Sequence, residues 1–254
     1  MKKEKENNQE KKQGAVYQAK ERTLIPGTDL SAEDEQDILR EAAPAYGVQG
    51  TETDGSEEFA EWNGKKQGEY TIEDYYQLPE DVRAELIDGV IFVMEAPATI
   101  HQAISAEIHF AFKSYIKRKK GTCKTYYSLL DIQLNRDNKT MVQPDVVIMC
   151  NRDIIQRKVI YGAPDLVVEV LSKSTRMKDR NIKLRKYREA GVREYWMVDP
   201  EQRQVIVYLF EEQQIYSQMI YDFGEQVPVG IFDGECQVDF EEIYEEVRYL
   251  YEKE

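Results

Sequence analysis

Three short apolar runs in the middle of the chain predict buried β-strands. They span residues 146–149, 166–171 and 194–198, and Pro, Asn or Gly residues bound them. Runs of this length that are rich in Val, Ile and aromatic residues are typical of strands covered on both faces. Between the second and third runs, Ser174 or Thr175 can cap a helix that continues to Ala190 and ends at Gly191.

The flanking segments predict the remaining elements. Ahead of the three runs, the pattern predicts helices at 71–76 and 80–83, a hairpin of strands 84–87 and 90–94 that turns at Asp88-Gly89, an amphipathic helix at 101–120 and a strand at 124–134. After them, it predicts an antiparallel meander of strands at 204–210, 215–221 and 227–229 and a final helix at 240–251. Strands interleaved with helices predict an α/β fold with a mixed central sheet flanked by helices.

Residues 1–69 differ in composition from the rest of the chain. They contain 10 Lys and Arg residues against 16 Asp and Glu residues, with few large aliphatic side chains. A segment of this kind cannot bury enough apolar surface to fold by itself. We therefore expect an acidic, mobile extension over residues 1–69, with a short helix at 32–41, followed by one folded domain over residues 70–254.

The composition of the whole chain narrows the classes of function. Its 254 residues carry a formal net charge of -14. This charge argues against a protein that binds nucleic acid over much of its surface, but it permits a local basic site. Cys123, Cys150 and Cys236 are far apart, so we expect neither a disulfide framework nor a CxxC zinc site. No apolar run reaches the roughly 18 residues of a membrane span, so we expect no membrane contact and a cytoplasmic location.

Two acids lie in or beside the buried runs, where an uncompensated carboxylate is costly. Asp145 precedes the first run and Glu169 lies inside the second, so neighbouring strands would bring both carboxylates within reach of one ion. Carboxylate oxygens, a backbone carbonyl such as that of Val170 and several waters suit Mg²⁺ or Mn²⁺ better than zinc. Asp165 is four residues from Glu169, about 13 Å along the strand, so we assign it a structural role.

Basic residues are concentrated directly after the strand that contains Glu169. Residues 173–188 contain eight Lys and Arg residues and a single acid, Asp179. A phosphate-bearing partner would explain this segment, and a solvated helix face is the alternative. On a helical wheel, Lys183 lies at the edge of the packed side, where its ammonium group can reach the acids, whereas Lys186 points farther away. Two acids, a divalent cation and a nearby lysine are what metal-assisted phosphodiester hydrolysis requires.

Several motifs, taken together, resemble a known family. In chain order they are ELIDGVIFVMEAP, His101, VQPDVVI, APDLVVEVLSKST, DRNIKLRKY and GVREYWMVDP, and they extend from about Tyr70 to Phe210. They are similar to the Uma-two restriction endonuclease family of the PD-(D/E)XK nuclease superfamily. The resemblance implies a restriction-endonuclease-like fold in which Asp145 and Glu169 are the metal-binding acids.

The resemblance also implies roles for further residues. Glu85 would correspond to the acid that often joins the metal site, and Lys183 to the family's downstream helical lysine. Leu171 stands where the D/E-x-K motif places its lysine, so Lys183 would be a migrated substitute. The position of His101 at the start of a helix indicates a helix cap or a packed histidine. The resemblance makes it a candidate site residue as well. Many nucleases of the superfamily are dimers, so the resemblance also implies a homodimer.

We therefore predict a metal-dependent endonuclease, a hydrolase that cleaves phosphodiester bonds in DNA with water as the nucleophile. The predicted catalytic residues are Glu85, Asp145, Glu169 and Lys183, the predicted metal ligands are Asp145, Glu169 and Val170, and His101 and Lys186 are secondary candidates. The nucleic acid would contact the segment from Lys173 to Arg188. Two alternatives remain open: a nuclease-fold module that binds nucleic acid or a protein partner without cutting, and an interaction protein in which Glu169 belongs to a buried structural ion pair.

Overall fold

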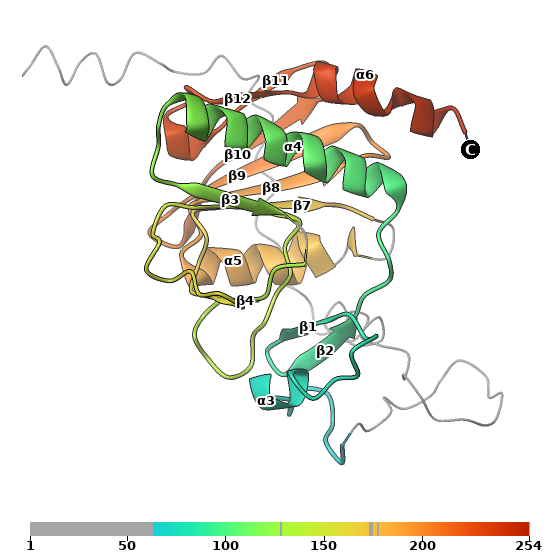
Figure 1. The fold of residues 1–254 in the computed structure, drawn as a ribbon, viewed down its shortest axis with the longest axis vertical. Coiled ribbons are helices and arrows are strands. Elements are labelled where there is room, and N and C mark those ends of the chain that lie inside the picture. Colours follow the sequence, from blue (N-terminus) through green and yellow to red (C-terminus); the bar gives the residue numbers. More distant parts are fainter. Residues whose placement is uncertain (1–62, 128, 173–174, 177, 254) are drawn as a thin grey trace, which may run out of the picture.

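A six-stranded mixed sheet forms the centre of the computed structural model, which describes residues 63–127, 129–172, 175–176 and 178–253 (Figure 1). The strand order is β10-β9-β8-β7-β5-β3; β7 and β8 are parallel, and the other neighbouring pairs are antiparallel. The strands are β3 (Lys124–Tyr127), β5 (Val146–Met149), β7 (Leu166–Val170), β8 (Glu194–Asp199), β9 (Gln204–Glu211) and β10 (Gln214–Asp222). The predicted mixed sheet flanked by helices is confirmed.

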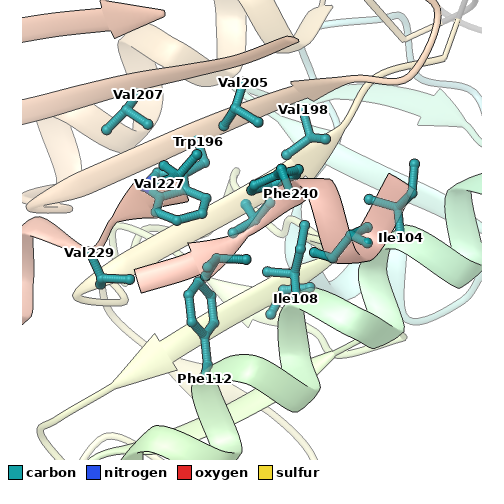
Figure 2. Close-up of a cluster of buried hydrophobic side chains, with 14 of the residues drawn as sticks. Ile104, Ile108, Phe112, Trp196, Val198, Val205, Val207, Val227, Val229 and Phe240 are labelled. Carbon is teal, nitrogen blue, oxygen red and sulfur yellow. The ribbon is translucent and has the colours of Figure 1, made fainter. Parts of the chain in front are cut away.

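A long helix covers one face of the sheet, with a second helix and a small strand pair beside it (Figure 1). These elements are α4 (Thr99–Arg118), β11 (Gln226–Pro228), a 3₁₀-helix (Gly230–Phe232), β12 (Gln237–Asp239) and α6 (Phe240–Tyr251). Trp196 of β8 fills the space between the helices, with its ring centroid 5.6 Å from that of Phe112 and 6.3 Å from that of Phe240 (Figure 2). This apolar layer fixes α4 on the sheet.

The opposite face of the sheet is covered by a π-helix that continues into α5, with a hairpin farther out (Figure 1). The elements on this side are α3 (Ile72–Tyr75), β1 (Ala84–Ile87), β2 (Val90–Val93), β4 (Ile132–Gln133), β6 (Ile160–Tyr161), the π-helix (Lys178–Lys183) and α5 (Leu184–Ala190). Tyr187 and Tyr195 are fully buried between the two layers. Gly191, with φ 92°, ends α5 as predicted. Within the described ranges, no helix has both the length and the apolar character that crossing a membrane requires.

The β1–β2 hairpin turns at Asp88-Gly89, as predicted, with φ 52° and 80° at the two residues. The carbonyl of Gly89 accepts hydrogen bonds from the N–H groups of Gly68 and Tyr70 at 2.9 and 3.1 Å. Lys65 also pairs with Asp74, at 2.6 Å between Nζ and Oδ2. Contacts with the folded domain thus begin a few residues before Tyr70. The helix expected at 32–41 lies outside the described residues.

Three predicted elements differ from the structure. Residues 80–83 are not helical: the Val82 N–H donates to the Pro79 carbonyl over 3.0 Å in a single turn, and the chain then enters β1 at Ala84. The strand predicted over 124–134 is two strands, β3 and β4, in different sheets, and Leu129 between them has φ 44°. The strand predicted at 227–229 is β11. It pairs with β12 and not with the strands of the central sheet, so the meander consists of β9 and β10.

The helix predicted from residue 174 or 175 to Ala190 is present, but part of it is not α-helical. Arg176 already lies in a helical turn, the π-helix follows from Lys178, and the chain is α-helical again from Leu184. The Thr175 hydroxyl lies 3.0 Å from that of Ser172 in the preceding turn, whereas Ser174 is outside the described residues. The wider π-turn changes which side chains share one side of the helix.

The cysteine prediction is wrong in one respect. Cys123 and Cys150 form a disulfide, and Cys236 is buried and free. The 27 residues that separate the bonded pair in sequence are bridged because β3 and β5 are antiparallel neighbours, with Lys124 opposite Met149. Distance along the chain therefore does not exclude a cross-strand bond.

Gly89→Ala should lower the free energy of unfolding by about 2 kcal/mol, because the residue needs φ +80° and a Cβ there would lie 2.5 Å from the Gly68 carbonyl oxygen. Urea denaturation followed by circular dichroism measures this loss. Gly224→Ala is the matched control, since a Cβ at that position meets nothing within 4 Å. Equal effects of the two substitutions would contradict the close approach at Gly89.

Candidate active site

Asp145 and Glu169 meet because β5 and β7 are antiparallel neighbours. Val146 pairs with Val168, so Asp145, one residue before β5, lies opposite Glu169 near the end of β7. The backbone N–H of Val170 donates to Asp145 Oδ2 over 2.7 Å and holds this carboxylate at the strand end. From the first turn of α4, His101 Nε2 approaches the same oxygen at 3.1 Å.

Glu169 points to the face of the sheet that carries the π-helix, because side chains alternate along a strand. Val168 and Val170 pack on the other side, in the layer under α4. Lys183 Nζ lies 2.8 Å from Glu169 Oε1, and the Tyr187 hydroxyl donates to the same oxygen over 2.6 Å. The hydrogen bonds that described residues make to this carboxylate therefore use one of its two oxygens.

Glu85 reaches the site from β1 and is fully buried. Lys183 Nζ lies 2.7 Å from its Oε1, and Lys178 Nζ lies 2.7 Å from its Oε2. Asp179 Oδ1 is 3.5 Å from the same Lys183 ammonium group. We call Glu85, Glu169, Lys178, Asp179 and Lys183 the acid–lysine cluster. Because Lys183 bridges Glu85 and Glu169, the cluster joins the hairpin to the central sheet.

The electrostatics of the cluster follow from burial and from the two ammonium groups. Burial alone would raise the pKa of Glu85, but Lys178 and Lys183 outweigh it and lower that pKa to about 2. Burial raises the pKa of Glu169 well above its usual value, which Lys183 only partly offsets while Asp179 and Asp145 add to it. Burial would lower the pKa of Lys183, yet its carboxylate neighbours raise it well above normal. Negative charge at Glu169 is thus incompletely compensated.

A cleft of about 410 Å³ opens onto these groups. Its floor includes Asp145, Glu169, Lys178, Asp179 and Lys183, and its rim includes Met94, Pro97, Ile100 and Leu129. His101 also lines it, and the buried Nδ1 atom of His101 has no hydrogen-bond partner among the described residues. The cleft therefore presents acids, two ammonium groups and the His101 ring to a ligand.

The structure brings together most of the residues selected from the sequence, namely Glu85, His101, Asp145, Glu169, Val170 and Lys183. Lys186 is not among them, because its ammonium group pairs with Asp88 at 2.6 Å. The sequence interpretation missed Lys178 and Asp179 as cluster members. Lys178 and Lys183 are five residues apart, and in a π-helix, where hydrogen bonds join residues i and i+5, such positions share one side.

Most cations of the basic segment 173–188 are paired within the fold. Six of its eight cations pair with acids of this same chain: Arg176 and Arg180 with Asp199, Lys178 with Glu85, Lys183 with Glu85 and Glu169, Arg185 with Asp88 and Glu189, and Lys186 with Asp88. Lys173 lies outside the described residues. The charge excess in the sequence is therefore largely neutralised within the fold, and a nucleic-acid contact through this segment stays a prediction.

Comparison with protein families identifies the chain. The model of the Uma2 family, described as "Putative restriction endonuclease", matches residues 72–240, which include every residue of the cleft floor. The chain belongs to the Uma2 family. The description of the Uma2 model thus names a nuclease of restriction endonuclease type.

Two further similarities accompany the Uma2 match. An uncharacterized protein of Synechocystis sp. is 36% identical over 118 residues, which are 45% of this chain and 60% of the relative, so the chain spans less than two thirds of that relative. The fold resembles the crystal structure of a putative nuclease of the DUF820 family from Anabaena variabilis, with a TM-score of 0.56 and 21% identity over 69% of this chain and 97% of that one. This likeness confirms the predicted restriction-endonuclease-like fold.

Glu85→Ala should lower the free energy of unfolding by about 3–5 kcal/mol, because it leaves two buried ammonium groups without a shared carboxylate. Urea denaturation measures the loss. Glu95→Ala, at an exposed carboxylate just after the same hairpin, is the control and should change stability by less than about 0.5 kcal/mol. Adding Lys178→Met to Glu85→Ala should recover about 1 kcal/mol or more. A double variant no more stable than Glu85→Ala would contradict the pairing.

Proposed function

We propose that this Uma2 protein is a metal-dependent endonuclease that hydrolyses phosphodiester bonds in DNA and uses Mg²⁺ or Mn²⁺. The observation that carries the proposal is the meeting of Asp145 and Glu169 at the floor of a cleft, with Lys183 2.8 Å from Glu169. Two carboxylates on neighbouring strands beside a lysine suit metal-assisted attack of water on a phosphodiester.

The donor set fits a hard divalent cation. Among the described residues, the hydrogen bonds and ion pairs of Glu169 use Oε1 and those of Asp145 use Oδ2, which leaves Glu169 Oε2 and Asp145 Oδ1 for a ligand from the cleft. No group of three or more His, Cys, Asp and Glu residues arranged to hold a metal ion occurs in the described part of the chain. Mg²⁺ is often bound by one or two carboxylates with waters and substrate phosphates, so two acids and the Val170 carbonyl suffice. A bound cation would also compensate the negative charge at Glu169.

The residues of the cluster have separable roles in this proposal. When bound, the cation lowers the pKa of a water molecule and offsets charge on the phosphate. Lys183 neutralises Glu169 Oε1 and presents an ammonium group to the cleft, where negative charge develops during phosphodiester cleavage. Glu85 and Tyr187 are positioning residues, because Glu85 binds the Lys183 ammonium group and Tyr187 fixes the Glu169 carboxylate.

One observation favours a second candidate function. Buried ion pairs join Glu85, Lys178, Lys183 and Glu169, and each of the two ammonium groups meets at least one carboxylate of this same chain. A nuclease-fold module that binds nucleic acid or a protein partner without cutting would have the same pairs as a structural element. Metal binding separates the two candidates, because the second requires none.

Calorimetric titration of the full chain with Mn²⁺ should detect a single site that Asp145→Asn and Glu169→Gln each abolish, because each substitution removes one of two anionic ligands. Affinity should rise when a DNA duplex is present, since phosphate oxygens complete the coordination. Asp165→Asn is the control: its carboxylate binds the Cys150 N–H and Arg193 and lies outside the cleft lining, so metal binding should persist. Absence of binding with and without DNA would favour the non-cutting candidate.

Lys183→Gln should lower the rate of plasmid nicking by about 10²–10³-fold, because it removes a cation from the place where charge develops. Lys186→Gln is the matched control, since this lysine lies on the same helical segment but pairs with Asp88 outside the cleft. Its nicking rate should stay within a few-fold of the original. Circular dichroism of both variants establishes that they are folded, and equal losses of activity would contradict the role of Lys183.

A further inference from the structure

A second basic segment lies at the carboxyl half of α4 and in the loop that follows it. Residues 113–124 contain six cations, namely Lys113, Lys117, Arg118, Lys119, Lys120 and Lys124, and no acid. All six side chains are exposed. In a chain with a net charge of -14, six successive cations without an acid form a distinct local field.

This second segment differs from residues 173–188 in the partners of its charges. Lys119 pairs with Glu235 at 2.9 Å, and both side chains are more than half exposed. Lys113, Lys117, Lys120 and Lys124 make no ion pair with any residue in the described parts of the chain. The charges of residues 113–124 are therefore available to a partner, whereas those of residues 173–188 are mostly used within the fold.

Exposed aromatic rings accompany these cations. Phe110, Lys113 and Lys117 are separated by three and four residues, so they lie along one side of α4. Phe110 is 65% exposed. Tyr127 at the end of the neighbouring β3 is 47% exposed, and its ring centroid is 4.7 Å from that of the buried His109. Cations beside exposed rings match the sugar–phosphate backbone of nucleic acid.

The fold holds this surface in place at the far end of the helix from the cleft. The Cys123–Cys150 disulfide ties the loop after α4 to the end of β5, and the exposed Arg152 there donates from Nε to the Thr122 carbonyl over 2.8 Å. Arg152 thus adds a further cation beside Lys124. Local acids are few, and they include Asp153 next to Arg152 and Glu235 beside Lys119.

Helix α4 connects this surface with the cleft. Ile100, His101 and Gln102 in its first turns line the cleft, and Lys117 is 16 residues beyond His101. At a rise of 1.5 Å per residue, the separation along the axis is about 24 Å. A DNA duplex with one base pair per 3.4 Å would cover that distance in about seven base pairs.

We propose that the carboxyl half of α4, with Lys113, Lys117, Lys120 and Lys124, is a phosphate-backbone contact surface for DNA whose scissile bond lies in the cleft. The DNA part of this inference rests on the proposed function. The surface binds sequence-independently and adds affinity for duplex that extends at least seven base pairs from the cleft. Two positions on one side of α4, Lys113 and Lys117, provide the test.

The experiment is fluorescence anisotropy of the full chain with labelled duplexes of 6 and 20 base pairs, in EDTA and over a series of salt concentrations. The double variant Lys113→Gln/Lys117→Gln should bind the longer duplex on the order of tenfold more weakly at low salt, and its plot of log K against log[salt] should be shallower by about 2, one unit per lost phosphate contact. Its affinity for the short duplex should be unchanged. Arg157→Gln/Lys158→Gln removes two exposed charges from another loop and is the control.

The outcomes separate this inference from the proposed function. If the α4 double variant binds the longer duplex like the original chain, the contact surface is refuted, whether or not plasmid is nicked. If the control variant loses as much affinity as the α4 variant, the effect is one of net charge and the surface is likewise refuted. If the α4 variant alone loses affinity and salt dependence while the original chain binds no metal and nicks no plasmid, the surface is supported and the endonuclease proposal fails.

Discussion

The structure depends on compensating one carboxylate that is buried in its central sheet. Glu169 lies on a strand whose other side chains are apolar, where an isolated negative charge would be too costly to retain. Lys183 offsets that cost, and it is itself buried, so it needs a second carboxylate from Glu85. The sheet, the π-helix and the hairpin are therefore joined by charge as well as by apolar contact, and no one of the three can shift without exposing an unpaired ion to a dry environment.

Much of this arrangement could be predicted from the sequence. Apolar residues that recur with the period of a strand or of a helix indicate directly which side chains are buried. The strands around Asp145 and Glu169 follow from their apolar runs, and their meeting follows once β5 and β7 are taken as neighbours. The position of Lys178 could not be predicted in this way, since a helical wheel assumes α-helical geometry and places residues five apart on different sides. The break in the strand at Leu129 could not be predicted either, because a left-handed backbone at one residue leaves the pattern of apolar and polar positions unchanged.

Charge is harder to interpret from sequence than hydrophobicity. A run of cations has the same appearance whether its partners are phosphates or acids of other segments. Here Glu85 and Asp88 lie far from residues 173–188 in sequence, and Asp199 lies at the end of the next strand. Apolar side chains bury wherever the fold permits, whereas an ion needs one specific partner that only the tertiary structure supplies. The sum of charges in a window therefore says little about the field that a ligand meets.

The π-helix has a consequence for how the chain tolerates insertion and deletion. A π-turn accommodates one more residue than the α-turn it replaces, so this segment is equivalent to an α-helix with a single inserted residue. Removing one residue between Lys178 and Lys183 would restore α-helical spacing, and the two lysines, then four residues apart, would still share one side of the helix. The π-turn therefore makes a change of length by one residue at this place compatible with both ammonium groups on the buried carboxylate.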